Sequence, residues 1–99
     1  MTAASTPAQT YEAFMVPFRF GPWAQTLIDR ANFRAGMHLL DLACGTGIVA
    51  RVAAARLGSD ASVAAIDMNP AMIEVARSVS ARDGLAIDWH VGLADDLPF

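Results

Sequence analysis

The sequence predicts an α/β fold in which a partial parallel sheet is built by β-α-β-α-β connections, with a helical segment in front of it. Three short apolar stretches, each too brief for a helix, alternate with two longer stretches rich in helix-forming residues. Glycines follow the first short stretch and an Asn-Pro pair follows the second, and both are signals for the start of a helix. Because such crossovers are right-handed and give parallel strands, we expect the strand order 3-2-1.

The length of 99 residues allows a single domain, which we divide into three parts. Residues 1–10, rich in Thr, Ala, Ser and Pro, predict a flexible tail. Residues 11–36 predict an N-terminal helical cap, and residues 37–99 the core. The sequence contains no run of about 18 apolar residues and no basic, apolar start, so we expect neither a membrane span nor a signal peptide. Cys44 is the single cysteine, which suits a reducing, cytoplasmic location.

The cap is predicted to contain a helix from Trp23 to Ala31, with Pro22 at its first position. Its Trp23, Leu27 and Ala31 follow one another at four-residue spacing and are expected on one face. Pro17 is expected to interrupt the helical turn before it. Aromatic residues gather in this segment, namely Tyr11, Phe14, Phe18, Phe20 and Trp23. They favour a cover for one face of the sheet, and a lid over a bound ligand is the alternative.

The first strand is expected at His38–Leu42, followed by a glycine turn and a helix over Ile48–Leu57 with Gly58 as its C-cap. Such a turn places bare backbone N–H groups at a helix N-terminus, where glycine leaves room for a ligand.

The second strand is expected over residues 61–67. Asn69 is then the N-cap of a helix over residues 70–81, which ends at Asp83-Gly84. Residues 85–91 predict the third strand.

The residues Gly45-Thr46-Gly47-Ile48-Val49-Ala50 fit the dinucleotide pattern G-x-G-x-x-G/A. Asp41, near the end of the first strand, argues against a pyrophosphate there, because its charge would repel phosphates and attract an ammonium or a sulfonium. Asp67, at the end of the second strand, is placed to accept hydrogen bonds from ribose hydroxyls. Asp67 supports a nucleoside without choosing between NAD and S-adenosylmethionine.

The segment Leu39-Leu40-Asp41-Leu42-Ala43-Cys44-Gly45-Thr46-Gly47 resembles motif I of class I methyltransferases that depend on S-adenosylmethionine. The nearest group is the ubiquinone and menaquinone biosynthesis methyltransferases of the type 11 kind. Ala43 stands where that family usually has the first glycine. The resemblance implies a Rossmann-like fold, S-adenosylmethionine as cofactor, and cofactor contacts from Asp41, Ala43, Gly45, Thr46 and Gly47.

Two further segments resemble the same family. Residues 63–72 match its second motif, which implies that Asp67 holds the ribose and that Met68 packs against adenine. Residues 91–99 match the segment after its third strand, where an Asp usually contacts the adenine amino group. Leu93 occupies that place here. The resemblance therefore implies that the Ala94 N–H serves the adenine ring and that Asp95 takes over the amino group.

Charge and composition argue against several other functions. The net charge is −3, lysine is absent and the seven arginines are scattered, which argues against a nucleic-acid surface. His38 and His90 are isolated, so no metal site is predicted. Cys44 has no neighbouring His in the sequence and is interpreted as a small apolar residue in a tight loop.

The resembling family has a larger sheet than this chain provides, so the chain corresponds to its cofactor-binding, N-terminal half. We expect the domain, when complete, to methylate a small-molecule acceptor, and the 99-residue chain alone to be inactive. The catalytic residues are not assigned. The strand at His38–Leu42 would be an open edge, which predicts a homo-oligomer through that edge. The alternatives are a fragment of an NAD-type oxidoreductase and a non-catalytic dimerising module.

Overall fold

The computed structural model describes residues 6–98, apart from the side chains of residues 14 and 17–20. The helices and strands alternate after the N-terminal segment as the sequence predicts. In chain order they are α1 (Pro7–Thr10), the π-helical segment η1 (Tyr11–Phe20), α2 (Gly21–Ala31), β1 (His38–Leu42), α3 (Ile48–Leu57), the 3₁₀ turn η2 (Gly58–Asp60), β2 (Ser62–Asp67), α4 (Pro70–Arg82) and β3 (Asp88–Val91).

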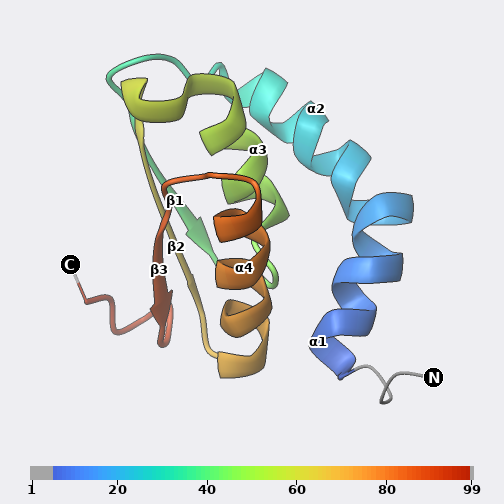
Figure 1. Ribbon diagram of the computed structural model, residues 1–99. Coiled ribbons are helices and arrows are strands. Elements are labelled where there is room, and N and C mark those ends of the chain that lie inside the picture. The colour runs from blue at the N-terminus through green and yellow to red at the C-terminus, as the bar shows by residue number, and fades with distance from the viewer. Residues whose placement is uncertain (1–5, 99) are drawn as a thin grey trace.

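The three strands form one parallel sheet in the order β1-β2-β3, with β2 in the centre. The same arrangement read from the opposite edge is 3-2-1. Helices α3 and α4 lie along one face of this sheet, and the N-terminal helices form an outer layer on the far side of α3 and α4 (Figure 1). The molecule is therefore layered in the order sheet, inner helices, outer helix.

The predicted bounds of β1 and α3 are confirmed, and so are the N-cap of α4 at Asn69 and the C-cap of α3 at Gly58. The third strand is shorter than predicted, because it begins at Asp88 and not at residue 85. The reason lies at the end of α4. Gly84 has a φ of +70°, and the Leu85 N–H donates to the Ser80 carbonyl at 2.9 Å, so this segment closes the helix and is not available to the sheet.

The predicted flexible tail is helical from Pro7 onward, while residues 1–5 lie outside the described part. Thr6 begins α1 with a capping box, in which its hydroxyl accepts from the Gln9 N–H and the Gln9 side chain accepts from the Thr6 N–H. Pro17 does not interrupt the helix. The backbone there is π-helical, and the Gly21 N–H donates to the Val16 carbonyl five residues earlier. This wider turn accommodates a residue that lacks an N–H group.

The buried face of α2 is displaced by one residue from the face that Trp23 and Leu27 share. Ala24 and Ile28 are buried, whereas Trp23 is 71% exposed and Leu27 is 53% exposed. Both pairs have the four-residue spacing of a helix face, so spacing alone could not select between them. Packing selects the pair with the smaller residue, because Ala24 lets α2 approach α3 closely.

The hydrophobic core lies between the sheet and α3 with α4. Ala50, Ala53 and Ala65 are fully buried there, and these small side chains let α3 lie close to the strands. Among the side chains that the structure describes, Ile66 and Ile73 are the largest apolar ones that are fully buried. Over the same residues, no helix is both long enough and apolar enough to cross a membrane.

Candidate functional site

The loop between β1 and α3 bends through three residues with positive φ. They are Ala43 at 54°, Gly45 at 60° and Gly47 at 81°. The loop is tied to the sheet by the Cys44 N–H, which donates to the Ile66 carbonyl at 3.0 Å, and is closed by the Gly47 N–H, which donates to the Cys44 carbonyl at 2.9 Å. No side chain caps α3 at Gly47, so the helix begins directly from this bend.

The two acids predicted as site residues lie on the same face of the sheet. Asp41 pairs in register with Ala65, and Asp67 follows Ala65 by two residues on β2. Asp67 is bound to the loop, because its Oδ2 accepts from the Gly45 N–H at 2.8 Å. Asp41 is bound to the helix, because its Oδ2 accepts from the Ala50 N–H at 3.3 Å. Both carboxylates therefore converge on the β1–α3 loop.

The site carries negative charge. Burial raises the pKa of Asp41 to about 6, the hydrogen bond from the Ala50 N–H lowers it, and the charge of Asp67 raises it further. The pKa of Tyr11 is raised as well, mainly by burial and then by the charge of Asp67. A cation bound at this site would therefore be attracted by the two carboxylates.

Two hollows meet at Ala43. The first, which we call the cap hollow, has a volume of about 240 Å³ and lies between the N-terminal helices and the loop. The second, which we call the strand-end hollow, has a volume of about 280 Å³ and lies beyond the ends of β2 and β3. The cap hollow is lined by Tyr11, Trp23, Ala24, Leu27, Asp41, Ala43, Cys44, Ile48 and Val49, and the strand-end hollow by Ala43, Ile66, Asp67, Met68, Gly92, Leu93 and Ala94.

Gly47 is covered by protein. A Cβ added there would lie 2.1 Å from Cη2 and 2.5 Å from Cζ3 of Trp89. The Trp89 ring is held in place because its Nε1–H donates to the Ser80 hydroxyl at 3.0 Å. Thr46 is also fully buried, and its Oγ1 has no hydrogen-bond partner within residues 6–98. These two predicted cofactor residues thus lie on the packed side of the loop.

Gly45 lies under Tyr11. A Cβ added there would be 3.1 Å from the Tyr11 hydroxyl oxygen and 3.3 Å from two ring carbons. The neighbouring Glu12 forms an ion pair with Arg51 of α3, in which both side chains are largely buried. Sequence reasoning did not assign Tyr11 to the site individually. The signal was the aromatic cluster, whose lid alternative fits Tyr11, whereas the side chains of Phe14, Phe18 and Phe20 lie outside the described part.

The remaining predicted residues divide between the strand-end hollow and its surroundings. Met68, which is 71% exposed, and Ala94 line this hollow together with Asp67. Asp95 is exposed and does not line it. Cys44 is buried, and burial raises the pKa of its thiol to about 12, which leaves it a poor nucleophile.

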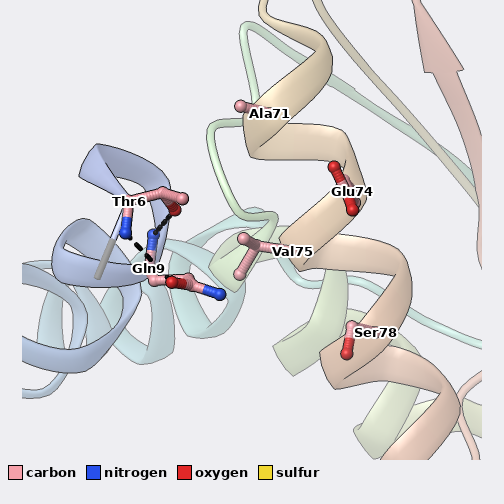
Figure 2. Close-up of a pocket in the computed structure, with 6 residues that line it drawn as sticks. All are labelled: Thr6, Gln9, Ala71, Glu74, Val75 and Ser78. Atoms are coloured by element: carbon pink, nitrogen blue, oxygen red, sulfur yellow. Dashed lines mark hydrogen bonds between the residues drawn. The ribbon is translucent and has the colours of Figure 1, made fainter. Parts of the chain in front are cut away.

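A third hollow lies between α1 and α4 (Figure 2). Its lining includes Thr6 and Gln9, which hydrogen-bond to each other, and Glu74 and Ser78 from α4. None of the predicted site residues lines it. This groove is where the first turn of the outer helix meets α4.

Comparisons with known proteins agree on one family. Residues 39–99 match the family described as "Methyltransferase domain". The chain is 34% identical over 97 residues to a demethylmenaquinone methyltransferase of Symbiobacterium thermophilum, covering 93% of the chain and 39% of that protein. It is 42% identical over 77 residues to the ubiquinone/menaquinone biosynthesis C-methyltransferase UbiE of Bordetella avium, covering 78% of the chain and 30% of that protein.

The fold is also found in solved structures. A crystal structure of an S-adenosylmethionine-dependent methyltransferase from Aquifex aeolicus superposes with a TM-score of 0.77 at 18% identity, over 96% of this chain and 52% of that one. At this identity the likeness concerns the Rossmann-like fold alone. The chain spans well under half the length of the two curated relatives. These matches support the methyltransferase interpretation and not the oxidoreductase alternative.

Proposed function

Because the chain belongs to the methyltransferase-domain family, we propose that its two hollows hold S-adenosylmethionine for methylation of a small-molecule acceptor. One observation supports this above others. Asp41 and Asp67 converge on the β1–α3 loop, and the hollows that they line meet at Ala43. A ligand with a nucleoside at one end and a cationic group at the other matches this arrangement of charge.

The strand-end hollow fits the adenosine part. Each Asp67 oxygen already accepts one backbone hydrogen bond, from Gly45 at 2.8 Å and from Asn69 at 2.9 Å. A carboxylate has about four acceptor sites, so Asp67 keeps the capacity to accept from both hydroxyls of a ribose. Met68 offers an exposed thioether for an aromatic ring, and Ala94 lines the same hollow. Asp95 does not line this hollow, so the structure adds no support for its contact with the adenine amino group.

The loop and the cap hollow fit the methionine part. Ala43 borders both hollows and Gly45 lies beneath Tyr11, whereas Thr46 and Gly47 lie on the packed side of the bend. When bound, S-adenosylmethionine supplies an already activated methyl group. The contribution of this chain is therefore to bind, to orient and to exclude water.

The acceptor is proposed from the relatives. Several of them are named for quinone and naphthoquinone methylation, and another is named for aklanonic acid. We propose a small-molecule acceptor and no nucleic acid, in line with the scattered arginines. The chain covers 39% and 30% of its two relatives above, so the 99-residue chain is expected to bind cofactor without turnover.

We further propose a homo-oligomer through β1, in a cytoplasmic location. Strand β1 lies at one edge of the sheet, and its Leu40 and Leu42 are 38% and 47% exposed. An apolar edge with unpaired backbone groups favours pairing with a second copy. Light scattering at micromolar concentration tests this proposal, and a monomer at all concentrations would refute it.

Calorimetric titration with S-adenosylhomocysteine and with NAD tests the proposed function. Binding of the first compound alone supports it, binding of NAD alone supports an oxidoreductase fragment, and binding of neither supports a non-catalytic module. Asp67→Asn should weaken S-adenosylhomocysteine binding by about tenfold or more, because an amide cannot accept from both ribose hydroxyls. Asp60→Asn removes the same charge from the 3₁₀ turn η2, outside both hollows, and should leave the affinity unchanged.

A further inference from the structure

The cap hollow has an unusual chemical lining for an apolar cavity. Two aromatic side chains, Tyr11 and Trp23, line it together with the carboxylate of Asp41. No arginine or histidine is among the described residues that line it. Aromatic rings with a carboxylate, and without a competing cation, are the surroundings that proteins use to bind onium groups, because the ring faces are electron-rich.

Tyr11 is held in the hollow from two sides. Its ring lies on Gly45, with the hydroxyl oxygen 3.1 Å from the position of a Cβ added there. The next residue, Glu12, is paired with Arg51, whose side chain is 9% exposed. A buried ion pair on α3 thus fixes the position of Tyr11 relative to the loop.

Trp23 reaches the same hollow from α2 without contributing to the core. It is 71% exposed, while its neighbour Ala24 takes the buried position against α3. Helix α2 is fixed to α3 because the Arg56 guanidinium pairs with Asp29 and donates to Gln25. The Trp23 side chain thus lines the hollow while most of its surface stays open to solvent, so it is available to a bound ligand.

We propose that Tyr11, Trp23 and Asp41 make the cap hollow a charge-reading subsite, which binds the sulfonium of S-adenosylmethionine in preference to a neutral thioether. This inference rests on the proposed function, because it places the adenosine in the strand-end hollow. It adds a specificity: the site distinguishes the cofactor before methyl transfer from the product after it. Since S-adenosylhomocysteine has lost the positive charge, the aromatic faces hold it less strongly, which favours its release.

The experiment compares the affinities of S-adenosylmethionine and S-adenosylhomocysteine by calorimetry on the chain and its variants. Trp23→Leu is the main variant, because this side chain is mostly exposed and its loss leaves the core intact. It should reduce the preference for the sulfonium by about fivefold, within the range of a cation–π contact. Trp23→Phe should restore most of the preference, and Tyr11→Leu should reduce it further.

Leu27→Ala is the matched control, since Leu27 lines the same hollow from the same helix without an aromatic face. It should weaken the binding of both compounds equally and leave the ratio of their affinities unchanged. If Trp23→Leu and Tyr11→Leu also leave the ratio unchanged while S-adenosylhomocysteine still binds, the charge-reading subsite is refuted and the proposed function stands. If the unmodified chain binds neither compound, both proposals are refuted.

Discussion

The two halves of the β1–α3 loop share a backbone pattern and differ in what covers them. In the second half, Thr46 is fully buried and Gly47 lies against the Trp89 ring. In the first half, Ala43 borders both hollows and Gly45 faces Tyr11. A single glycine-rich motif thus contains a packing half, which touches β3, and a half that touches the cap, which is the proposed ligand half.

The difference shows that glycine can be required in one loop for more than one physical reason. Gly47 is required because an aromatic side chain from another strand occupies the space of its Cβ, whereas a Cβ at Gly45 would be in tight contact with Tyr11, at 3.1 to 3.3 Å. Substitutions in the packing half should therefore reduce stability, and substitutions in the ligand half should chiefly alter binding.

The largest effect is expected for Gly47→Ala. The new Cβ would lie 2.1 Å from the Trp89 ring, at a φ of 81° that an L side chain rarely adopts. Together, displacement of the ring and backbone strain should lower the free energy of unfolding by about 3 kcal/mol. Urea denaturation followed by circular dichroism measures this change.

Gly84→Ala is the control for Gly47→Ala. Gly84, which follows the end of α4, also has a positive φ, of 70°, and nothing lies within 4 Å of an added Cβ. It should cost only the backbone strain of about 1 kcal/mol. Equal losses at Gly47 and Gly84 would contradict the division of the loop, because they would show that Trp89 does not matter.

A change in the opposite direction is expected for Asp41→Asn. The folded pKa of Asp41 is about 6, above the ordinary value of 3.8, so the ionised group destabilises the fold once the pH exceeds both values. Near pH 7.5, the neutral amide should raise the free energy of unfolding by up to about 3 kcal/mol, since a shift of one pKa unit corresponds to about 1.4 kcal/mol. The side-chain oxygen of the new amide can still accept from the Ala50 N–H.

The pH dependence tests this interpretation of Asp41. The stabilisation by Asp41→Asn should vanish as the pH falls from about 6 to below 4, where the carboxyl is protonated in both states. The same variant should weaken binding of S-adenosylmethionine at neutral pH, because the negative charge is lost. A stability gain that does not depend on pH would contradict the assigned cause.

An intermediate effect is expected for Gly45→Ala. The added Cβ would lie 3.1 to 3.3 Å from Tyr11, at a φ of 60°. We expect a loss of about 1–2 kcal/mol in unfolding free energy, together with weaker cofactor binding, since the ring must shift. Tyr11→Ala in the same chain should recover part of the stability, and calorimetry with S-adenosylhomocysteine measures the binding.

The smallest effect is expected for Ala43→Gly. Ala43 has a φ of 54°, which glycine adopts without strain. Relief of the backbone strain stabilises the fold, and the greater entropy of glycine in the unfolded chain opposes this gain. The net free energy of unfolding should rise by about 0.5 kcal/mol. Ala61→Gly, at an ordinary φ of −143°, should lower it by a similar amount, and a decrease at both sites would show that Ala43 is not strained.

The sequence predicted the inner part of the fold nearly to the residue. The bounds of β1 and α3 and the start of α4 follow from local signals, namely a short apolar run, glycines with positive φ and the Asn69-Pro70 cap. The positions of Asp41 and Asp67 near the ends of β1 and β2 were also predicted, because parallel strands bring their carboxyl ends to one edge of the sheet.

The outer part was predicted less well. Both Trp23–Leu27 and Ala24–Ile28 have helical spacing, and only contact with α3 decides between them. The helix through Pro17 and the short β3 likewise depend on local competition between hydrogen bonds, which residue preferences do not settle.

By itself, the sequence determined the alternation of strands and helices, the two acids and the glycine bend, since each depends on residues that are close together in the chain. Only the tertiary structure decided that Gly47 packs against Trp89 and Gly45 against Tyr11, and that Tyr11 and Trp23 share a hollow with Asp41. The physical reason is that these roles depend on side chains from α2, η1 and β3. Their approach to the loop is a property of long-range packing, which no local pattern encodes.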